Sequence, residues 1–106
     1  MKLNFQLVEK GPEIGGTWFW NKYPGVGCDV VSHLYSLSFF RNPNWTKSFS
    51  LGDEIHSYLK RFWRFARLEE NTRLNTTVHS MEWSDDANVW KVVIGDQEEQ
   101  FDWVIR

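Results

Sequence analysis

A long irregular segment near the N-terminus constrains the fold of this 106-residue chain more than any other feature. Residues Gly11 to Asn44 contain five of the seven glycines and all three prolines, and they show no sustained helical or strand periodicity. Loops of this length are uncommon in compact domains unless they bind something. The sequence therefore predicts regular elements on either side of this segment, and a binding role for the segment itself.

A short strand is predicted before this segment and a helix after it. Residues Leu3 to Val8 alternate and end in an apolar pair, which is typical of a strand. A helix is predicted from Asp53 to Arg67, and Ser50 with Asp53 has the spacing of a capping box at its start. Apolar side chains recur in this helix at helical spacing and define one face: Ile55, Tyr58, Leu59, Phe62, Trp63 and Ala66.

The last third of the chain is predicted to be β-structure. Arg73 to His79 is one candidate strand, and Met81 and Trp83 extend its pattern. A cluster of turn-forming residues follows at 85–88. Two β-rich runs separated by residues 95–99 then predict a hairpin: Val89–Ile94 and Gln100–Ile105. The predicted fold class is α/β, with one main helix and a C-terminal antiparallel β-meander.

Charge and composition exclude several classes of partner. The net charge of -2 and the pI of about 5.9 argue against nucleic-acid binding. The basic cluster of Arg61, Arg64 and Arg67 is interpreted as a solvated helix face. No apolar run approaches the roughly 18 residues of a membrane span, so no membrane segment is expected and a cytoplasmic location is the default.

Cysteine and histidine usage predicts no metal site. Cys28 is the only cysteine, so neither an intrachain disulfide nor a thiolate cluster can form, and a small buried hydrophobic role suits it better than a nucleophilic one. His33, His56 and His79 lack the spacing of metal ligands. Each histidine is therefore expected to be structural or exposed.

Features just before and at the start of the irregular segment suggest a dinucleotide-binding site. Glu9 follows the predicted strand, where an acidic residue binds the ribose hydroxyls in dinucleotide-binding folds. Gly15 and Gly16 would let the backbone approach a cofactor closely. Each feature also has an ordinary interpretation as a solvated glutamate or a plain turn, and the motif G-x-G-x-x-G does not occur in the chain. The seven tryptophans suit a core, a stacking surface for a planar ligand, or both.

The complete run from Glu9 to Phe39 is more specific than these parts. It contains Gly-Gly-Thr-Trp at positions 15–18, and it resembles the segment that follows the second strand of the FAD domain in Baeyer–Villiger monooxygenases and related flavin-containing monooxygenases. The resemblance continues through residues 42–45, 54–59 and 74–78 and ends in 90–93 and 101–105. It implies that residues 1–106 form a partial FAD/NAD(P)-binding Rossmann-like domain. The first βα unit, with its G-x-G-x-x-G turn, and the NADP domain are missing from such a piece.

The resemblance also implies an activity and a set of site residues. The activity is an FAD-dependent, NADPH-using oxygenation, in which O2 supplies an oxygen atom inserted beside the carbonyl of a small ketone-like substrate. Asp29 is the implied catalytic residue, which helps to place an active-site arginine and contacts both cofactors; a turn-forming role is its alternative. Many family members carry an arginine where this chain has Gly27. The implied FAD-binding residues are Glu9, Gly15, Gly16, Thr17, Trp18, Trp20, Tyr35 and Val78, and the implied NADP-binding residues are Gly27, Cys28 and Asp29.

The missing parts set further expectations. The isolated chain is expected to be inactive, to bind FAD weakly or not at all, and to need the missing parts of the same fold as its partner. Two other functions stay open at this point. One is a non-catalytic module that stacks a sugar or planar ligand on exposed tryptophans. The other is a truncated product with no function of its own.

Overall fold

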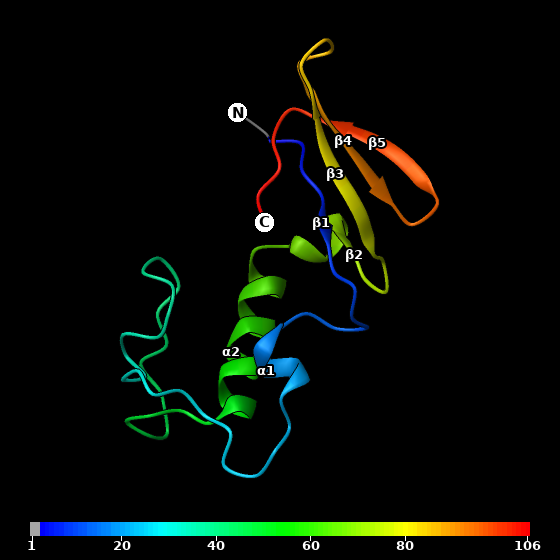
Figure 1. Cartoon of the computed structure of the whole chain (residues 1–106). Coiled ribbons are helices and arrows are strands. Elements are labelled where there is room, and N and C mark those ends of the chain that lie inside the picture. The colour runs from blue at the N-terminus through cyan, green and yellow to red at the C-terminus, as the bar shows by residue number, and fades with distance from the viewer. Residues whose placement is uncertain (1–2) are drawn as a thin grey trace. The chain divides into compact units, whose positions relative to one another are not determined.

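In the computed structural model, which describes residues 3–106, the chain divides into two units (Figure 1). One unit combines the residues up to Pro12 with Asn71–Arg106, and the other consists of Glu13–Glu70. The first unit holds the strands and the second holds the two α-helices. The predicted mixture of one main helix and a C-terminal antiparallel meander is confirmed.

The first unit contains a short parallel pair of strands. Strand β1, Leu7–Val8, pairs with β2, Thr72–Arg73, and the Glu9 amide continues the pairing by donating to the Arg73 carbonyl over 2.9 Å. The prediction of a strand over Leu3–Val8 is therefore too long. Residues 3–6 precede the ladder with β2 and carry exposed side chains, so alternation alone overestimated the strand.

The predicted strand Arg73–His79 is broken in the middle. Residues 74–77 form a turn in which Asn75 has a φ of 51°. The Thr76 hydroxyl donates to the Leu74 carbonyl over 2.8 Å, and the Thr76 amide donates to the Glu9 carbonyl over 3.0 Å. The backbone groups of this segment thus bond to the residues after β1 instead of extending a ladder.

A three-stranded antiparallel meander completes the first unit (Figure 1). Strand β3, Val78–Ser84, pairs with β4, Val89–Ile94, which pairs with β5, Gln97–Phe101. Val92 and Ile94 of β4 supply the buried side chains. The predicted position of β5, Gln100–Ile105, is wrong because Ile94 pairs with Gln97 across a tight turn at Gly95, whose φ is 57°. The ladder then ends at Phe101, opposite Trp90.

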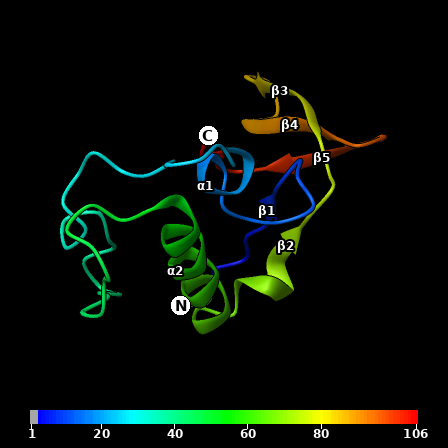
Figure 2. The same ribbon diagram turned by 90° about the horizontal axis from the view of Figure 1, so that it is seen from below.

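The second unit is built on α2, Gly52–Phe65, which agrees with the predicted helix within two residues at each end. The short helix α1, Thr17–Trp20, packs on α2, and the irregular residues 21–50 lie beside it (Figure 2). A 3-10 turn, Leu68–Asn71, follows α2. The predicted capping box is wrong, because Leu51 is the N-cap residue and makes no side-chain cap. The Ser50 hydroxyl instead lies 2.6 Å from the buried Ser32 hydroxyl.

Candidate functional site

The two consecutive glycines form a turn that leads directly into α1. Gly15 has a φ of 128° and Gly16 a φ of 51°, which side chains with a Cβ rarely adopt. Their carbonyls accept the first hydrogen bonds of α1, from the Trp18 amide to Gly15 over 3.0 Å and from the Trp20 amide to Gly16 over 2.9 Å. This backbone geometry produces a helical turn within the segment that the sequence predicts to be irregular throughout.

His56 of α2 packs directly against this turn. A Cβ placed on Gly15 would lie 2.5 Å from His56 Cδ2, so the ring occupies the space that any other residue would need. The His56 Nε2 atom lies 2.8 Å from the Ile14 carbonyl oxygen, and the residue is 8% exposed. The sequence allowed His56 to be structural or exposed, and the structure shows it buried and bonded.

An ion pair holds Glu13, the residue immediately before Ile14. The Lys60 ammonium, one helical turn after His56, pairs with the Glu13 carboxylate. That hydrogen bond and the charge of Lys60 keep the pKa of Glu13 below its ordinary value, against the opposing effect of desolvation. Glu13 and Ile14 are therefore both attached to the same face of α2.

The side chains of α1 differ in their contacts and in their exposure. The Trp18 indole N–H donates to the Tyr35 hydroxyl over 3.1 Å, and the two rings meet edge to face with centroids 5.8 Å apart. Phe19 faces His56 with a centroid distance of 5.8 Å. Trp20 is 58% exposed and Thr17 is exposed. Two residues that the sequence assigned to FAD, Trp18 and Tyr35, are thus joined although they lie far apart in the chain.

The segment around Asp29 is attached to the N-terminal end of α2. Gly27 forms a bridge with Leu51, and the Cys28 amide donates to the Ser50 carbonyl over 2.9 Å. A Cβ on Gly27 would approach the Ser50 carbonyl oxygen to 3.0 Å, so a side chain at this position would crowd that oxygen. Asp29 itself is exposed and makes no hydrogen bond or ion pair with residues 3–106. Its carboxylate is therefore free to receive a donor from outside this part of the structure.

Two side chains of α2 hold backbone groups between residues 37 and 46, and the sequence interpretation missed both roles. The Tyr58 hydroxyl, buried at 2% exposure, accepts from the Leu37 amide over 2.8 Å and donates to the Phe40 carbonyl over 2.7 Å. The Glu54 carboxylate accepts from the amide and the hydroxyl of Thr46. A tyrosine on an otherwise apolar helix face was the available signal, because a buried phenol needs a partner.

Glu9 and Val78 belong to the other unit. A carboxylate oxygen of Glu9 accepts from the Gly11 amide over 2.6 Å, which fixes the side chain at the end of β1. Val78 is the first residue of β3 and is half-buried. The nine other predicted site residues all lie in the unit formed by Glu13–Glu70: Gly15, Gly16, Thr17, Trp18, Trp20, Gly27, Cys28, Asp29 and Tyr35.

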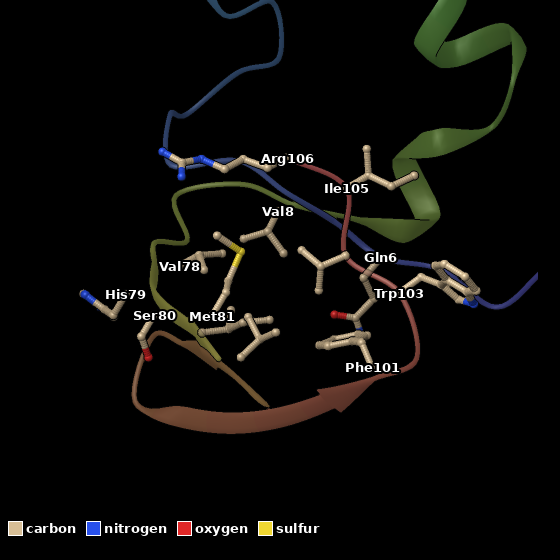
Figure 3. Close-up of a pocket in the computed structure, with 13 residues that line it drawn as sticks. Gln6, Val8, Val78, His79, Ser80, Met81, Phe101, Trp103, Ile105 and Arg106 are labelled. Carbon is tan, nitrogen blue, oxygen red and sulfur yellow. The ribbon is translucent and has the colours of Figure 1, made fainter. Parts of the chain in front are cut away.

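The strand unit also contains an open groove beside β1 (Figure 3). Its cavity volume is about 700 Å³. The groove is lined mainly by apolar side chains, among them Val8, Val78, Met81, Phe101 and Ile105. Two of the lining side chains, Trp103 and Ile105, are 87% and 99% exposed.

Two kinds of site are not found in the described residues. Residues 3–106 contain no group of three or more His, Cys, Asp or Glu side chains that could hold a metal ion. Over the same residues, no helix has the length and apolar character required to cross a membrane.

Comparison with known proteins identifies relatives for most of the chain, although no family model matches it. A Baeyer–Villiger monooxygenase from Pseudomonas aeruginosa is 45% identical over 87 residues, which is 82% of this chain and 16% of that protein. A Baeyer–Villiger monooxygenase from Streptomyces coelicolor is 38% identical over 84% of this chain and 17% of its own length. An FAD-binding monooxygenase from Aspergillus terreus is 38% identical over 94% of this chain and 18% of its own.

Solved structures agree with these relatives. The open crystal structure of cyclohexanone monooxygenase matches 91% of this chain and 20% of its own, with a TM-score of 0.84 and 32% identity. Oxidized steroid monooxygenase bound to NADP matches 90% of this chain and 19% of its own, with a TM-score of 0.79 and 31% identity. The fold is therefore that of a segment of a flavin-dependent monooxygenase.

Within that class, the chain is homologous to one segment of the Baeyer–Villiger monooxygenases. It spans 16 to 18% of the length of the three curated relatives described above. The resemblance found in the sequence is thereby confirmed, and the FAD and NADP named for these relatives agree with the cofactors that it implies.

Proposed function

We propose that this chain serves as the flavin-facing segment of an FAD-dependent, NADPH-using monooxygenase that inserts an oxygen atom from O2 beside the carbonyl of a small organic substrate. The observation that carries the proposal is the Gly15–Gly16 turn, whose geometry presents α1 on the helix α2. The 45% identity to a Baeyer–Villiger monooxygenase over most of the chain supports it. We also propose a cytoplasmic location, the default for a sequence without a long apolar run.

The residues around α1 suit a flat, largely apolar cofactor. A Cβ on Gly16 would meet no heavy atom within 4 Å, so this face of the turn is open to an approaching ring. Trp20 offers an exposed indole, and Trp18 and Tyr35 support each other edge to face. Aromatic side chains in such arrangements bind planar groups by stacking. The open glycine turn and the aromatic side chains beside it therefore fit a flavin.

Each predicted site residue has a role in this proposal. Bound FAD would supply the oxygen chemistry, which no side chain of the protein provides. Asp29 would accept a hydrogen bond from an arginine of the remaining fold and so place that arginine near both cofactors. The other roles are those of binding: Thr17, Trp18, Trp20 and Tyr35 for the flavin, Gly15 and Gly16 for close backbone approach, Glu9 for the ribose, Val78 for the adenine through its backbone, and Gly27 and Cys28 for NADP.

We further propose that the rest of the same fold is the partner of this chain. Nine of the thirteen residues that line the groove beside β1 are apolar, and two of these, Trp103 and Ile105, are 87% and 99% exposed. A surface of this kind is stabilised when another element covers it. The chain alone would then bury too little of the FAD to hold it, so it should bind FAD weakly or not at all.

A replacement experiment tests the proposal. The chain is substituted for the matching segment of the Pseudomonas aeruginosa relative, and the hybrid is assayed for bound flavin, for NADPH oxidation and for oxygenation of a ketone. The hybrid should bind FAD and oxidise NADPH, and Asp29→Ala should abolish oxygenation while flavin stays bound. Asp86→Ala, at an exposed turn, is the matched control and should have no effect. A folded hybrid without flavin would contradict the proposal, and stoichiometric flavin on the isolated chain would contradict the need for a partner.

A further inference from the structure

His56 is a buried ionisable residue to which the proposed function gives no role. It lies on the face of α2 that packs on α1, two residues before the buried Tyr58, and it is 8% exposed. A buried imidazole is costly unless its polar atoms have partners, so its presence at this position calls for a physical reason.

The ring contacts three consecutive parts of the flavin-facing turn. Its Nε2 atom lies 2.8 Å from the Ile14 oxygen, immediately before the glycines. Its Cδ2 atom fills the space beside Gly15, where a Cβ would come within 2.5 Å. The centroid of its ring lies 5.8 Å from the centroid of the Phe19 ring in α1. The His56 side chain thereby contacts the residue before the turn, the first glycine of the turn and the helix α1 that follows it.

The contact with Ile14 determines which nitrogen of the ring is the donor. A carbonyl oxygen can only accept a hydrogen bond, so the Nε2 atom must carry the proton. The Ile14 carbonyl belongs to a half-buried residue and gains a donor that an aliphatic side chain could not supply. Shape alone would allow Leu at this position, but the hydrogen bond would then be lost.

Charged neighbours attach the same turn to α2 at a second point. The Glu13 carboxylate pairs with Lys60, and one of its oxygens lies 4.0 Å from His56 Nε2. The positive charge of Lys22 also acts on this carboxylate and helps to lower the pKa of Glu13. The two residues before the glycines are thus both attached to α2, which leaves the turn little freedom to change its direction.

We propose that His56 is a positioning residue: it fixes the backbone of the Gly15–Gly16 turn and so determines how Thr17, Trp18 and Trp20 are presented to the flavin. The reference to flavin rests on the proposed function, but the conformational claim does not. In the absence of His56, the same glycines that permit this turn would also permit other conformations, because glycine adopts both signs of φ readily.

Amide hydrogen exchange on the whole chain, followed by NMR without flavin, tests this inference. His56→Leu should raise the exchange rates of the Trp18, Phe19 and Trp20 amides about tenfold, the factor expected when one hydrogen bond that orders a turn is lost. His56→Gln should restore protection to within about threefold, because its amide can still donate to a carbonyl. Cys28 and Leu37 provide reference amides, since their partners Ser50 and Tyr58 lie elsewhere in this unit.

A control variant on the same helix separates an effect of His56 from a general effect of substitution. Arg61→Gln changes an exposed residue of the same helix and should leave all these amides unchanged. Equal protection in wild type and His56→Leu, or no recovery in His56→Gln, would overturn the inference. If His56→Leu fails to fold, the nitrogen spectrum of the wild-type ring still decides: a proton on Nε2 supports the inference and an unprotonated Nε2 refutes it. Failure of the hybrid enzyme to bind FAD would count against the proposed function and leave these measurements valid.

Discussion

The Tyr58 hydroxyl makes a sharp prediction, because one oxygen atom joins α2 to two backbone groups of the irregular segment. Tyr58→Phe removes its bonds of 2.8 Å to the Leu37 amide and 2.7 Å to the Phe40 carbonyl while leaving the ring in place. Each lost hydrogen bond costs about 1 to 1.5 kcal/mol when water can partly replace it, as at the half-buried Leu37 and Phe40. The free energy of unfolding should therefore fall by about 2 to 3 kcal/mol.

Urea denaturation followed by tryptophan fluorescence measures this change. A small protein loses about 1 to 3 kcal/mol of stability per molar urea, so the midpoint should fall by roughly 1 to 2 M. Tyr23→Phe makes the same chemical change at a residue that is 62% exposed and serves as the control, with an expected effect within about 0.5 kcal/mol. The reasoning would be refuted if both variants unfolded at the same urea concentration, or if the Leu37 amide kept its exchange protection in Tyr58→Phe.

Three further predictions concern other parts of the chain. Gly15→Ala should destabilise the second unit by about 2 to 4 kcal/mol in the same denaturation assay, because φ is 128° and the new methyl group would overlap the ring of His56; an unchanged midpoint would count against the described turn. The Glu13–Lys60 pair should stabilise the folded chain above the ordinary pKa of a glutamate, and this stabilisation should be lost as pH falls through the lowered pKa of Glu13. Wild type and Glu13→Gln should therefore converge in their free energies of unfolding in acid. A difference that stays constant at all pH values would contradict this. Ile94 of β4 is 2% exposed, so Ile94→Val should lower the stability of the strand unit by about 1 kcal/mol. Amide hydrogen exchange in β3, β4 and β5 measures this loss. Unchanged protection of these amides would show that β4 does not carry the core.

Side chains of helix α2 bond to residues 14–46 at several points. Its residues reach this segment at well-separated points, through His56 at Ile14, Tyr58 at Leu37 and Phe40, and Glu54 at Thr46. Backbone groups in a loop need partners as much as those in a helix do, and here side chains of the helix provide them. A long loop can therefore hold a defined shape without becoming regular structure.

The sequence by itself determined the elements that depend on local pattern. The apolar period after Ser50 predicted α2 within two residues, and the β-rich run Val89–Ile94 predicted β4 with its bounds. The run from Glu9 to Phe39, together with the matching pieces up to Ile105, identified the monooxygenase family, because the residues of each piece are adjacent in the chain and can be read together.

The tertiary structure decided what depends on distant partners. The sequence cannot show that His56 meets Ile14, 42 residues away, or that Trp18 bonds to Tyr35 across 17 residues. It also placed β5 too late, since the end of a strand depends on where its neighbour stops pairing. Local pattern fixes which residues become helix or strand, whereas side-chain hydrogen bonds and strand register depend on which segments folding brings into contact.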